Sequence, residues 1–517
     1  MFDSSARSVQ KINLETYHDK VLGCWTGKNI GGTIGAPFEG QREVNHATFY
    51  TQELGGKPAP NDDLDLQLIW LIAAEENGIY RLNERILGEY WLTNITGPWN
   101  EYGVCKANIR NGLVPPLSGS CNNDIWKYSN GAWIRSEIWA CIFPGSPDEA
   151  AQFAYFDACC DHCGEGIYAE IFTATMESAA FIVSDIREII RIGLSRIPGD
   201  CRIARSVKLA CDCYDKGVDF PAAREAMVKD SEDLGWFQAP ANIGFVIIGL
   251  LYGEGDFGKS VCLANNCGDD TDCTAGTVGA IMGIIMGRSG IPQEWIEPIG
   301  ESIQTCSIDT YGRNNLCGLP KTLDELTDRV IRLALTAQQE NLTLPQIVSQ
   351  PGAITADYRE KLFNAEPVIK RIWSKSPYEL SFDLPYGRFS VDYDRGPEVV
   401  PGENKKLTLK MSHVRFIEKV VSVKLLLPEG WLAQPSAECI FTVKHSHLAA
   451  VEVTLIPGDF AGAYFYLPVE IRLCDRFNPI IIHIPLQRRG SVKHNPSLVC
   501  QDFFDSANRC RSRLETR

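Results

Sequence analysis

The sequence lacks the features that mark membrane, secreted and nucleic-acid-binding proteins. Its longest apolar run, TVGAIMGIIMG, is shorter than the ~20 residues that a helix needs to cross a bilayer. The N-terminal stretch MFDSSARSVQKINLETYHDK contains no apolar core of the kind found in signal peptides. The chain has no dense run of lysine and arginine, and its formal net charge is −15, which argues against nonspecific nucleic-acid binding. We therefore expect a cytoplasmic protein that binds neither membranes nor nucleic acids.

The 19 cysteines do not form a recognisable disulfide or zinc pattern. In a cytoplasmic protein they are expected to be reduced and mostly buried. One segment, ACCDHC, brings Cys159, Cys160, His162 and Cys163 together, but no second Cys-x-x-Cys pair follows at zinc-finger spacing. Buried thiols are therefore favoured over a zinc site, and His162 could instead line a binding cleft.

Two kinds of periodicity divide the chain. From about residue 14 to residue 339, apolar residues recur every three or four positions, as in LDLQLIWLIAAEENG, which predicts helices. Asp185 and Thr322 stand where helix N-caps are expected. From about Pro377, short alternating segments such as RFSVDYD and AAVEVTLIPG predict a β-sandwich of about seven strands.

The sequence thus predicts a multidomain protein, with a large all-α helical bundle followed by a C-terminal β-sandwich. The expected parts are an N-terminal tail (1–14), the all-α catalytic domain (15–345), a linker (346–376), the β-sandwich (377–490) and a C-terminal tail (491–517). The β-sandwich carries no catalytic constellation. We expect it to bind a partner, to shape the cleft or to mediate homo-oligomerisation.

Two of the helical segments carry glycine at every fourth residue. These glycines are Gly23, Gly27, Gly31 and Gly35 in the first segment and Gly279, Gly283 and Gly287 in the second. Each glycine costs up to ~1 kcal/mol relative to alanine inside a helix, so a compensating gain is expected. Glycine stripes allow two helix backbones to approach closely, which predicts that the two segments pack together at the centre of the bundle.

Acidic residues gather at the ends of these apolar segments. They are Glu39 after the first glycine segment, Asp62, Asp63 and Asp65 at the start of another helix, and Asp269, Asp270 and Asp272 before the second glycine segment. A helix N-cap needs only one aspartate, and adjacent carboxylates resist ionising together unless a cation lies between them. Clustered oxygen ligands favour Mg²⁺, Mn²⁺ or Ca²⁺. The pattern therefore predicts a divalent-metal site.

Four stretches of the sequence carry a family resemblance. They are GCWTGKNIGGTIGAPFEG, NDDLDLQ, NGAWIR and NNCGDDTDCTAGTVGAIMGIIMG. In this order they resemble motifs of the ADP-ribosylglycohydrolase family, which includes the dinitrogenase reductase-activating glycohydrolases, over about residues 15–345. The resemblance implies an all-α bundle with two Mg²⁺ ions at the base of a cleft. It also implies hydrolysis of a glycosidic bond at a ribose anomeric carbon, above all the removal of ADP-ribosyl groups.

The resemblance also implies roles for individual residues. The implied metal ligands are Asn61, Asp62, Asp63, Asp270, Asp272 and Cys273. The implied substrate contacts are the loop that begins with Ser129, Asn130, Gly131 and Ala132, together with His162. Glu39 matches the family's acidic residue after the first glycine segment.

Other assignments come from the residues themselves. Glu39 and Asp270 are the candidate carboxylates for stabilising positive charge at the anomeric carbon and for taking a proton from water. Backbone N–H groups at Ser118 and Gly119, and at the start of the Ser129 loop, could receive phosphates, with ordinary turn hydrogen bonding as the alternative. Trp236 could stack on a sugar or base, although core packing explains it equally well.

The sequence departs from the family pattern close to the implied metals. Asn61, Leu64 and Cys273 replace threonines there. Apart from these, Lys28–Asn29 stands where relatives often have Asp-Ala, which marks a divergent branch of the family. Because cysteine is a poor ligand for Mg²⁺, one of the two metals is expected to bind weakly, to be Mn²⁺ or to be absent. Two alternatives stay open: a hydrolase of another furanoside or small glycoside, and a non-catalytic ADP-ribose- or sugar-binding protein with a degraded metal site.

Overall fold

The computed structural model describes residues 10–98, 100–308, 318–350, 352, 354–413, 418–444 and 448–492. A large helical region over residues 14–373 is followed by a strand-rich region of two β-sheets, which confirms the predicted fold class. Most of the two predicted tails lies outside the described residues. The chain divides into two compact units, and the domain limits expected from the sequence stay predictions.

The first unit, here called the helical unit, consists of the described residues in 1–97, 126–158 and 162–374. Its longer helices are α1 (Leu14–Gly35), α2 (Asp62–Asn77), α3 (Glu84–Thr93), α7 (Pro147–Ala158), α8 (Glu165–Ala180), α9 (Ile186–Leu194), α10 (Arg202–Asp215), α11 (Phe220–Asp230), α12 (Ala239–Tyr252), α13 (Phe257–Asn266), α14 (Thr271–Met286) and α16 (Leu323–Glu340). Its shorter elements are β1 (Lys11–Asn13), η1 (Ala36–Phe38), η2 (Ile79–Arg81), η3 (Trp133–Arg135), α6 (Glu137–Ile142), η4 (Arg288–Gly290), α15 (Gln293–Ile296), β2 (Gln346–Val348), α17 (Ala356–Leu362) and α18 (Pro367–Trp373).

Side-chain caps explain where several of these helices begin. The predicted caps are confirmed, because Asp185 and Thr322 accept hydrogen bonds from the backbone N–H groups of Glu188 and Glu325. Each bond uses one of the N–H groups that a helix start leaves without an internal partner. The local sequence therefore sets the ends of α9 and α16.

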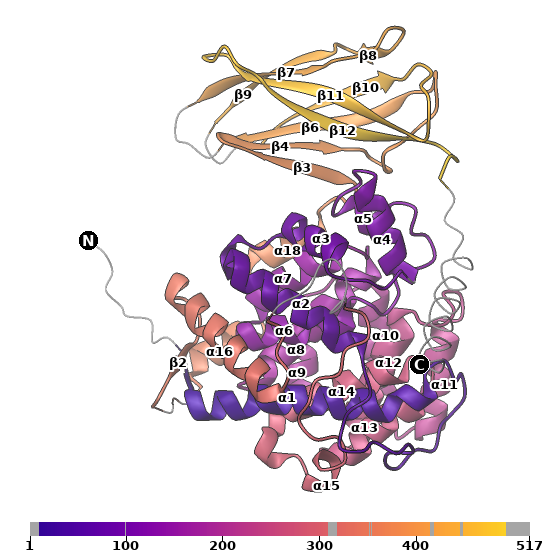
Figure 1. Cartoon of the computed structure of the whole chain (residues 1–517), viewed down its shortest axis with the longest axis vertical. Coiled ribbons are helices and arrows are strands. Elements are labelled where there is room, and N and C mark those ends of the chain that lie inside the picture. Colours follow the sequence, from indigo (N-terminus) through magenta and orange to yellow (C-terminus); the bar gives the residue numbers. More distant parts are fainter. Residues whose placement is uncertain are drawn as a thin grey trace, which may run out of the picture. The chain divides into compact units, whose positions relative to one another are not determined.

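The two glycine segments become α1 and α14, which run antiparallel and make the most extensive helix contact among the described residues (Figure 1). A Cβ atom on Gly27 would lie 1.9 Å from the carbonyl oxygen of Gly279, and one on Gly23 would lie 2.4 Å from that of Gly283. These distances are far shorter than any van der Waals contact, so the two backbones touch directly. The prediction that the glycine segments pack together is confirmed.

Antiparallel packing brings the end of α1 against the start of α14. A Cβ atom on Gly35 would lie 2.3 Å from both the Cα and the backbone nitrogen of Asp272. Gly287 differs from the predicted stripe, because it is the C-cap of α14, with φ +71°, and its close neighbour is the Asp19 carboxylate. The helix contact thus ends beside the acidic residues of α14.

The second unit, here called the sheet unit, consists of the described residues in 98–125, 159–161 and 375–492. Besides α4 (Asn100–Arg110) and α5 (Leu117–Ser120), it contains β3 (Glu379–Leu384), β4 (Gly387–Asp392), β5 (Glu398–Val399), β6 (Lys405–His413), β7 (Lys419–Leu425), β8 (Leu432–Gln434), β9 (Glu438–Val443), β10 (Ala449–Ile456), β11 (Tyr464–Leu473) and β12 (Ile480–Arg488). The strand orders are β3-β4-β6-β10-β8 and β5-β12-β11-β7-β9.

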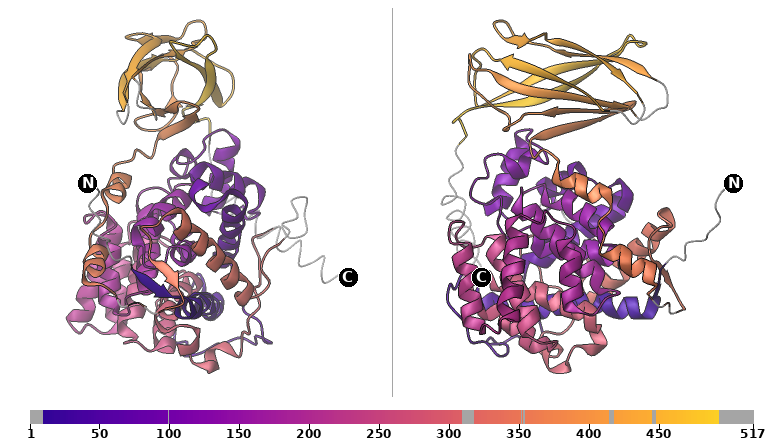
Figure 2. Two further views of the ribbon diagram at one scale, coloured as in Figure 1. Left: turned by 90° about the vertical axis from the view of Figure 1, so that its left-hand side faces the viewer. Right: turned by 180° about the vertical axis from the view of Figure 1, so that it is seen from behind.

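The two sheets enclose one hydrophobic core, as a β-sandwich does. Alternate residues of β6, including Leu407 and Leu409, belong to the same buried cluster as Val421 and Val423 of β7, and Figure 2 shows the sheets as facing layers. The first sheet is antiparallel, and the second is antiparallel except for the β12–β5 pair. The described residues contain ten strands in these sheets, not about seven, because β3, β5 and β8 were not expected.

Two further expectations concern cysteines and membranes. Every cysteine in the described part of the chain is free, and most are buried, as the sequence predicts. None of the helices in the described ranges combines the length and the apolar character that crossing a membrane requires.

Replacing Gly27 with alanine tests the contact between α1 and α14. In an isolated helix alanine is more stable than glycine by up to ~1 kcal/mol. Here the added Cβ would overlap the backbone of Gly279, so we expect the free energy of unfolding to fall by roughly 1–3 kcal/mol, measured by urea denaturation.

The matched control is Gly199→Ala, because no atom lies within 4 Å of a Cβ placed there. Its free energy of unfolding should stay within ~0.5 kcal/mol of that of the unmodified protein. A Gly27→Ala protein that is as stable as this control would contradict the backbone contact.

Candidate metal centre

Carboxylates from three separate parts of the sequence meet at the start of α14. Glu39, Asp270 and Asp272 each place one oxygen within 4.8 Å of the others. Asp63, Asp272 and Cys273 form a second group with ligand atoms at the same spacing, so Asp272 belongs to both groups. No other such group of histidine, cysteine, aspartate and glutamate occurs in the described residues.

Glu39 is positioned by the turn that follows α1. It lies directly after η1, and the next residue, Gly40, donates its N–H to the Asp269 carbonyl oxygen at 2.8 Å. In return, the Asp269 N–H donates to the Gln41 carbonyl oxygen at 2.7 Å. This pair of backbone bonds fastens the turn to the loop before α14 and brings Glu39 to the acidic end of that helix.

Asp62 and Asp63 occupy the first turn of α2. The Asn61 side-chain oxygen accepts the N–H of Asp63 at 2.7 Å and so caps this helix. A Cβ on Gly32 would lie 2.3 Å from the Asn61 amide nitrogen, so the start of α2 packs tightly on α1. In this structure Asn61 is a helix cap, and its role as a metal ligand stays a prediction.

A buried lysine lies beside Asp63. The Lys28 Nζ is 3.2 Å from Asp63 Oδ2 and 2.9 Å from Glu137 Oε1, and it donates to the Ile134 carbonyl oxygen at 2.6 Å. The three charged side chains are at most 1% exposed. Burial alone would lower the pKa of Lys28, but the two carboxylates outweigh it and raise that pKa. Lys28 is therefore a charged counter-ion inside the site.

The sequence pattern does not predict this role for Lys28 or for Glu137. A signal was present, because Lys28 lies in the middle of an apolar, glycine-rich helix that is buried on most sides. A lysine in such a place must pair with an acid. Nothing in the sequence shows that the acids are Asp63 and Glu137.

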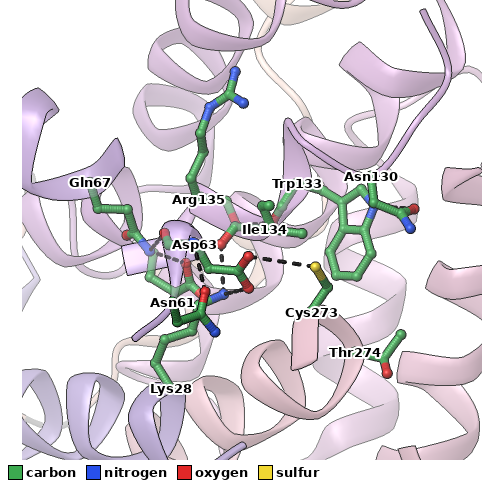
Figure 3. Close-up of polar contacts among 12 residues, drawn as sticks. Lys28, Asn61, Asp63, Gln67, Asn130, Trp133, Ile134, Arg135, Cys273 and Thr274 are labelled. Carbon is green, nitrogen blue, oxygen red and sulfur yellow. Dashed lines mark hydrogen bonds and ion pairs between the residues drawn. The ribbon is translucent and has the colours of Figure 1, made fainter. Parts of the chain in front are cut away.

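Cys273 contacts the other oxygen of the Asp63 carboxylate. Its thiol donates to Asp63 Oδ1, with 3.5 Å between sulfur and oxygen. Figure 3 shows the Asp63 carboxylate between Lys28 and Cys273, with dashed lines to both. Burial raises the pKa of the Cys273 thiol well above its usual value. Cys273 is therefore a hydrogen-bond donor here, and its predicted role as a metal ligand is not needed to explain its position.

The carboxyl groups of the site resist ionisation. Burial and the neighbouring carboxylates raise the pKa of Glu39 and of Asp272 to about 7, even though the Glu39 side chain still reaches solvent. The pKa values of Asp62 and Asp270 are also raised well above their usual range, by burial and by the charge of Asp63 and Asp272 respectively. Asp272 is buried, and its Oδ1 has no hydrogen-bond partner. An oxygen donor set in this condition fits a divalent cation.

Two aspartates next to the acidic cluster, Asp65 and Asp269, are stabilised by hydrogen bonds from neighbouring groups. Asp65 Oδ2 accepts the backbone N–H groups of Cys306 at 2.7 Å and Ser307 at 2.6 Å. Asp269 accepts the N–H of Phe237 at 3.1 Å and the side-chain amide of Asn242 at 2.8 Å. Burial raises the pKa of each aspartate, but these bonds limit the value to about 6. Both residues therefore fix loops around the site.

The predicted substrate loop is tied to the acidic cluster through Asn130. Its side-chain amide donates to Asp270 Oδ2 at 2.7 Å, while its side-chain oxygen accepts the indole N–H of Trp133 at 3.1 Å. The Gly131 carbonyl oxygen accepts a hydrogen bond from Arg135. The loop is thus rigidly held, and it orients the Asp270 carboxylate.

Ser129 and Ala132 of this loop are buried, and so is His162, which lies beside Ser129. Ser129 Oγ lies 3.0 Å from His162 Nε2 and donates to the Trp126 carbonyl oxygen at 2.6 Å. The Ser129 N–H also donates to the Trp126 carbonyl oxygen, which is ordinary turn hydrogen bonding. The roles of these three residues as substrate contacts stay predictions.

Ser118 and Gly119 belong to the sheet unit, whereas the acidic cluster belongs to the helical unit. Ser118 Oγ donates to the Cys160 carbonyl oxygen at 2.5 Å, and the Gly119 carbonyl oxygen accepts the side-chain amide of Asn123 at 2.9 Å. These bonds are internal to the sheet unit. A role for the two residues in binding phosphate stays a prediction.

Trp236 is partly exposed and lines a cavity of about 420 Å³ together with Phe245 and Asp269. The Arg42 guanidinium carbon lies 4.7 Å from the centre of the indole ring. The ring is therefore accessible beside the loop that carries the acidic cluster, although an arginine covers one of its faces.

The model of the ADP-ribosylglycohydrolase family matches residues 13–368, and the strands of the two sheets, from β3 on, lie outside the match. No match is found among the curated proteins.

Asp272→Asn and Asp269→Asn test the difference between the two carboxylates. Asp272 has an oxygen without a hydrogen-bond partner, whereas Asp269 accepts several hydrogen bonds. At pH 8, in EDTA, the Asp272 carboxylate is repelled by its neighbours, so Asp272→Asn should raise the melting temperature of the metal-free protein. Asp269→Asn weakens charged acceptor bonds and should lower the free energy of unfolding by roughly 1–3 kcal/mol. Thermal unfolding followed by circular dichroism measures both, and an Asp272→Asn protein destabilised as much as Asp269→Asn would contradict the distinction.

Proposed function

Because the chain belongs to the ADP-ribosylglycohydrolase family, as the match over residues 13–368 establishes, we propose that it hydrolyses the glycosidic bond at a ribose anomeric carbon. The preferred reaction is the release of ADP-ribosyl groups from a modified substrate. The observation that supports this proposal is the convergence of Glu39, Asp270 and Asp272 at the junction of α1 and α14. Carboxylates of this kind are what hydrolysis at an anomeric carbon requires.

The donor set indicates where a metal would be held. Glu39, Asp270 and Asp272 would bind a divalent cation such as Mg²⁺ or Mn²⁺, because oxygen donors with an unpartnered buried oxygen suit such ions. When bound, the cation supplies positive charge that favours ionised carboxylates and an acidic water. Asn130 keeps the Asp270 carboxylate in a fixed orientation by its 2.7 Å hydrogen bond.

The chemical step then follows from the positions of the carboxylates. The bond from the anomeric carbon to the leaving group breaks, its electron pair departs with the leaving group, and the carbon becomes positively charged. Asp270 and Asp272 stabilise that charge electrostatically. Glu39 is the exposed member of the cluster, so it can accept a proton from the water whose oxygen forms the new bond to the carbon.

Replacing Glu39 with glutamine tests this assignment. We expect kcat for the release of ADP-ribose from ADP-ribosylated protein, measured at saturating Mn²⁺, to fall by roughly 10²–10⁴-fold, with the circular dichroism spectrum of the folded protein unchanged. The matched control is Glu43→Gln, because Glu43 is an exposed glutamate of the same loop that belongs to neither acidic group. Equal activity in both variants would remove Glu39 from catalysis.

The substrate panel decides between the proposal and its alternatives. Mn²⁺-loaded protein should release ADP-ribose from at least one of arginine-linked, serine-linked and O-acetyl ADP-ribose. Hydrolysis of aryl ribofuranosides alone would favour a different glycoside hydrolase. Calorimetric binding of ADP-ribose without hydrolysis of any member of the panel would favour a binding protein.

A further inference from the structure

The Asp63 carboxylate already has a partner at each of its oxygens. Lys28 Nζ lies 3.2 Å from Oδ2, and the Cys273 sulfur lies 3.5 Å from Oδ1. Lys28 is the ion-pair partner of Oδ2, and the Cys273 thiol donates a hydrogen bond to Oδ1. A metal ligand must instead turn a lone pair toward the cation, so Asp63 is engaged in a way that competes with metal binding.

Lys28 is held firmly in this position. Its ammonium contacts Glu137 Oε1 at 2.9 Å and the Ile134 carbonyl oxygen at 2.6 Å, and Glu137 in turn accepts the Gln67 side-chain amide at 2.7 Å. Its stem crosses α14 where Gly276 offers no side chain, with Cδ 3.4 Å from the position of a Cβ there. The lysine is therefore held beside Asp63 by its two ion pairs and its hydrogen bond.

Three further carboxylates, those of Glu39, Asp270 and Asp272, are placed differently. Asp272 is nine-tenths buried and has an Oδ1 without a hydrogen-bond partner, while Glu39 is open to solvent. Asp270 has one neutral donor, Asn130, on Oδ2. Among the residues that the structure describes, no ammonium or guanidinium forms an ion pair with Glu39, Asp270 or Asp272. Their negative charge is the part of the site that is not yet balanced.

Electrostatics favours a cation at Glu39, Asp270 and Asp272 over a cation beside Asp63. The Lys28 ammonium repels a divalent cation placed beside Asp63, because like charges a few ångströms apart in a buried site interact strongly. The same ammonium already compensates Asp63 and Glu137. A second divalent cation would therefore gain little at Asp63 and would have to displace a lysine that is fixed by three polar contacts.

We infer that this centre holds a single divalent cation, bound by Glu39, Asp270 and Asp272, and that the Lys28 ammonium replaces a second cation beside Asp63. The inference rests on the proposed function in that both use the same acidic cluster. It distinguishes this chain from the two-metal site that the family resemblance implies.

Counting bound metal tests the inference. The full chain is stripped with EDTA and titrated with Mn²⁺ in a calorimeter, and the Mn²⁺-loaded protein is examined by electron paramagnetic resonance. We expect one Mn²⁺ per chain and the six-line spectrum of an isolated ion. Two Mn²⁺ per chain with an exchange-coupled spectrum would overturn the inference, and so would the absence of binding.

Matched variants identify the ligands. Asp272→Asn should weaken Mn²⁺ binding by at least about 30-fold, because it removes a ligand. Asp63→Asn should change the dissociation constant by less than about threefold, because Asp63 is paired with Lys28 and is not a ligand of the cation. Equal weakening in both variants would make Asp63 a ligand and overturn the inference. Lys28→Met should allow a second Mn²⁺ to bind, and a Lys28→Met protein that keeps one Mn²⁺ would overturn the role given to the lysine.

The number of bound Mn²⁺ ions is measured independently of the hydrolysis assay. One bound Mn²⁺ without release of ADP-ribose from any substrate would support the inference and contradict the proposed function. Two bound Mn²⁺ with hydrolysis would do the reverse.

Discussion

The centre depends on the direct contact between the backbones of α1 and α14. Gly23 and Gly27 lie on Gly283 and Gly279 at distances that admit no side chain. Because the helices are antiparallel, this contact ends with Gly35 against the first turn of α14. A larger residue in the stripe would push the two helix ends apart, and with them the carboxylates that they carry. Glycine lowers the stability of a helix relative to alanine, but here it allows the close contact that brings acidic residues from distant parts of the sequence together.

Electric charge is the second constraint on this region. Each buried carboxylate must find a hydrogen-bond donor, an ammonium or a cation. Asp65 and Asp269 accept hydrogen bonds from backbone N–H groups, and Asp63 forms an ion pair with Lys28. Glu39, Asp270 and Asp272 are left with most of their charge uncompensated. The helix that supplies the close contact also supplies the lysine, since Lys28 directly follows Gly27. Packing and charge compensation are therefore coupled in one helix.

Much of the architecture could be predicted from the sequence because its signals are local. The helical period, the caps at Asp185 and Thr322 and the glycine spacing each depend on residues within a few positions of one another. The missed strands show the limit of such signals. β5 and β8 are two and three residues long, too short for an alternating pattern, and they are strands only because a neighbouring strand offers hydrogen bonds. β3 is longer, and its sequence ELSFDL does alternate apolar and polar residues, so this strand was missed although the signal was present.

The sequence alone determined which residues could take part in a metal centre, since acidic clusters at helix starts and a glycine stripe are legible without coordinates. Only the tertiary structure decided which role each of those residues has in the site. Asn61 caps a helix, Cys273 donates to Asp63, and Lys28 enters a site in which no local pattern had placed it. The reason is physical. Periodicity and capping act over a few bonds along the chain, whereas the pairing of charges depends on distances of about 3 Å between segments that only packing brings together.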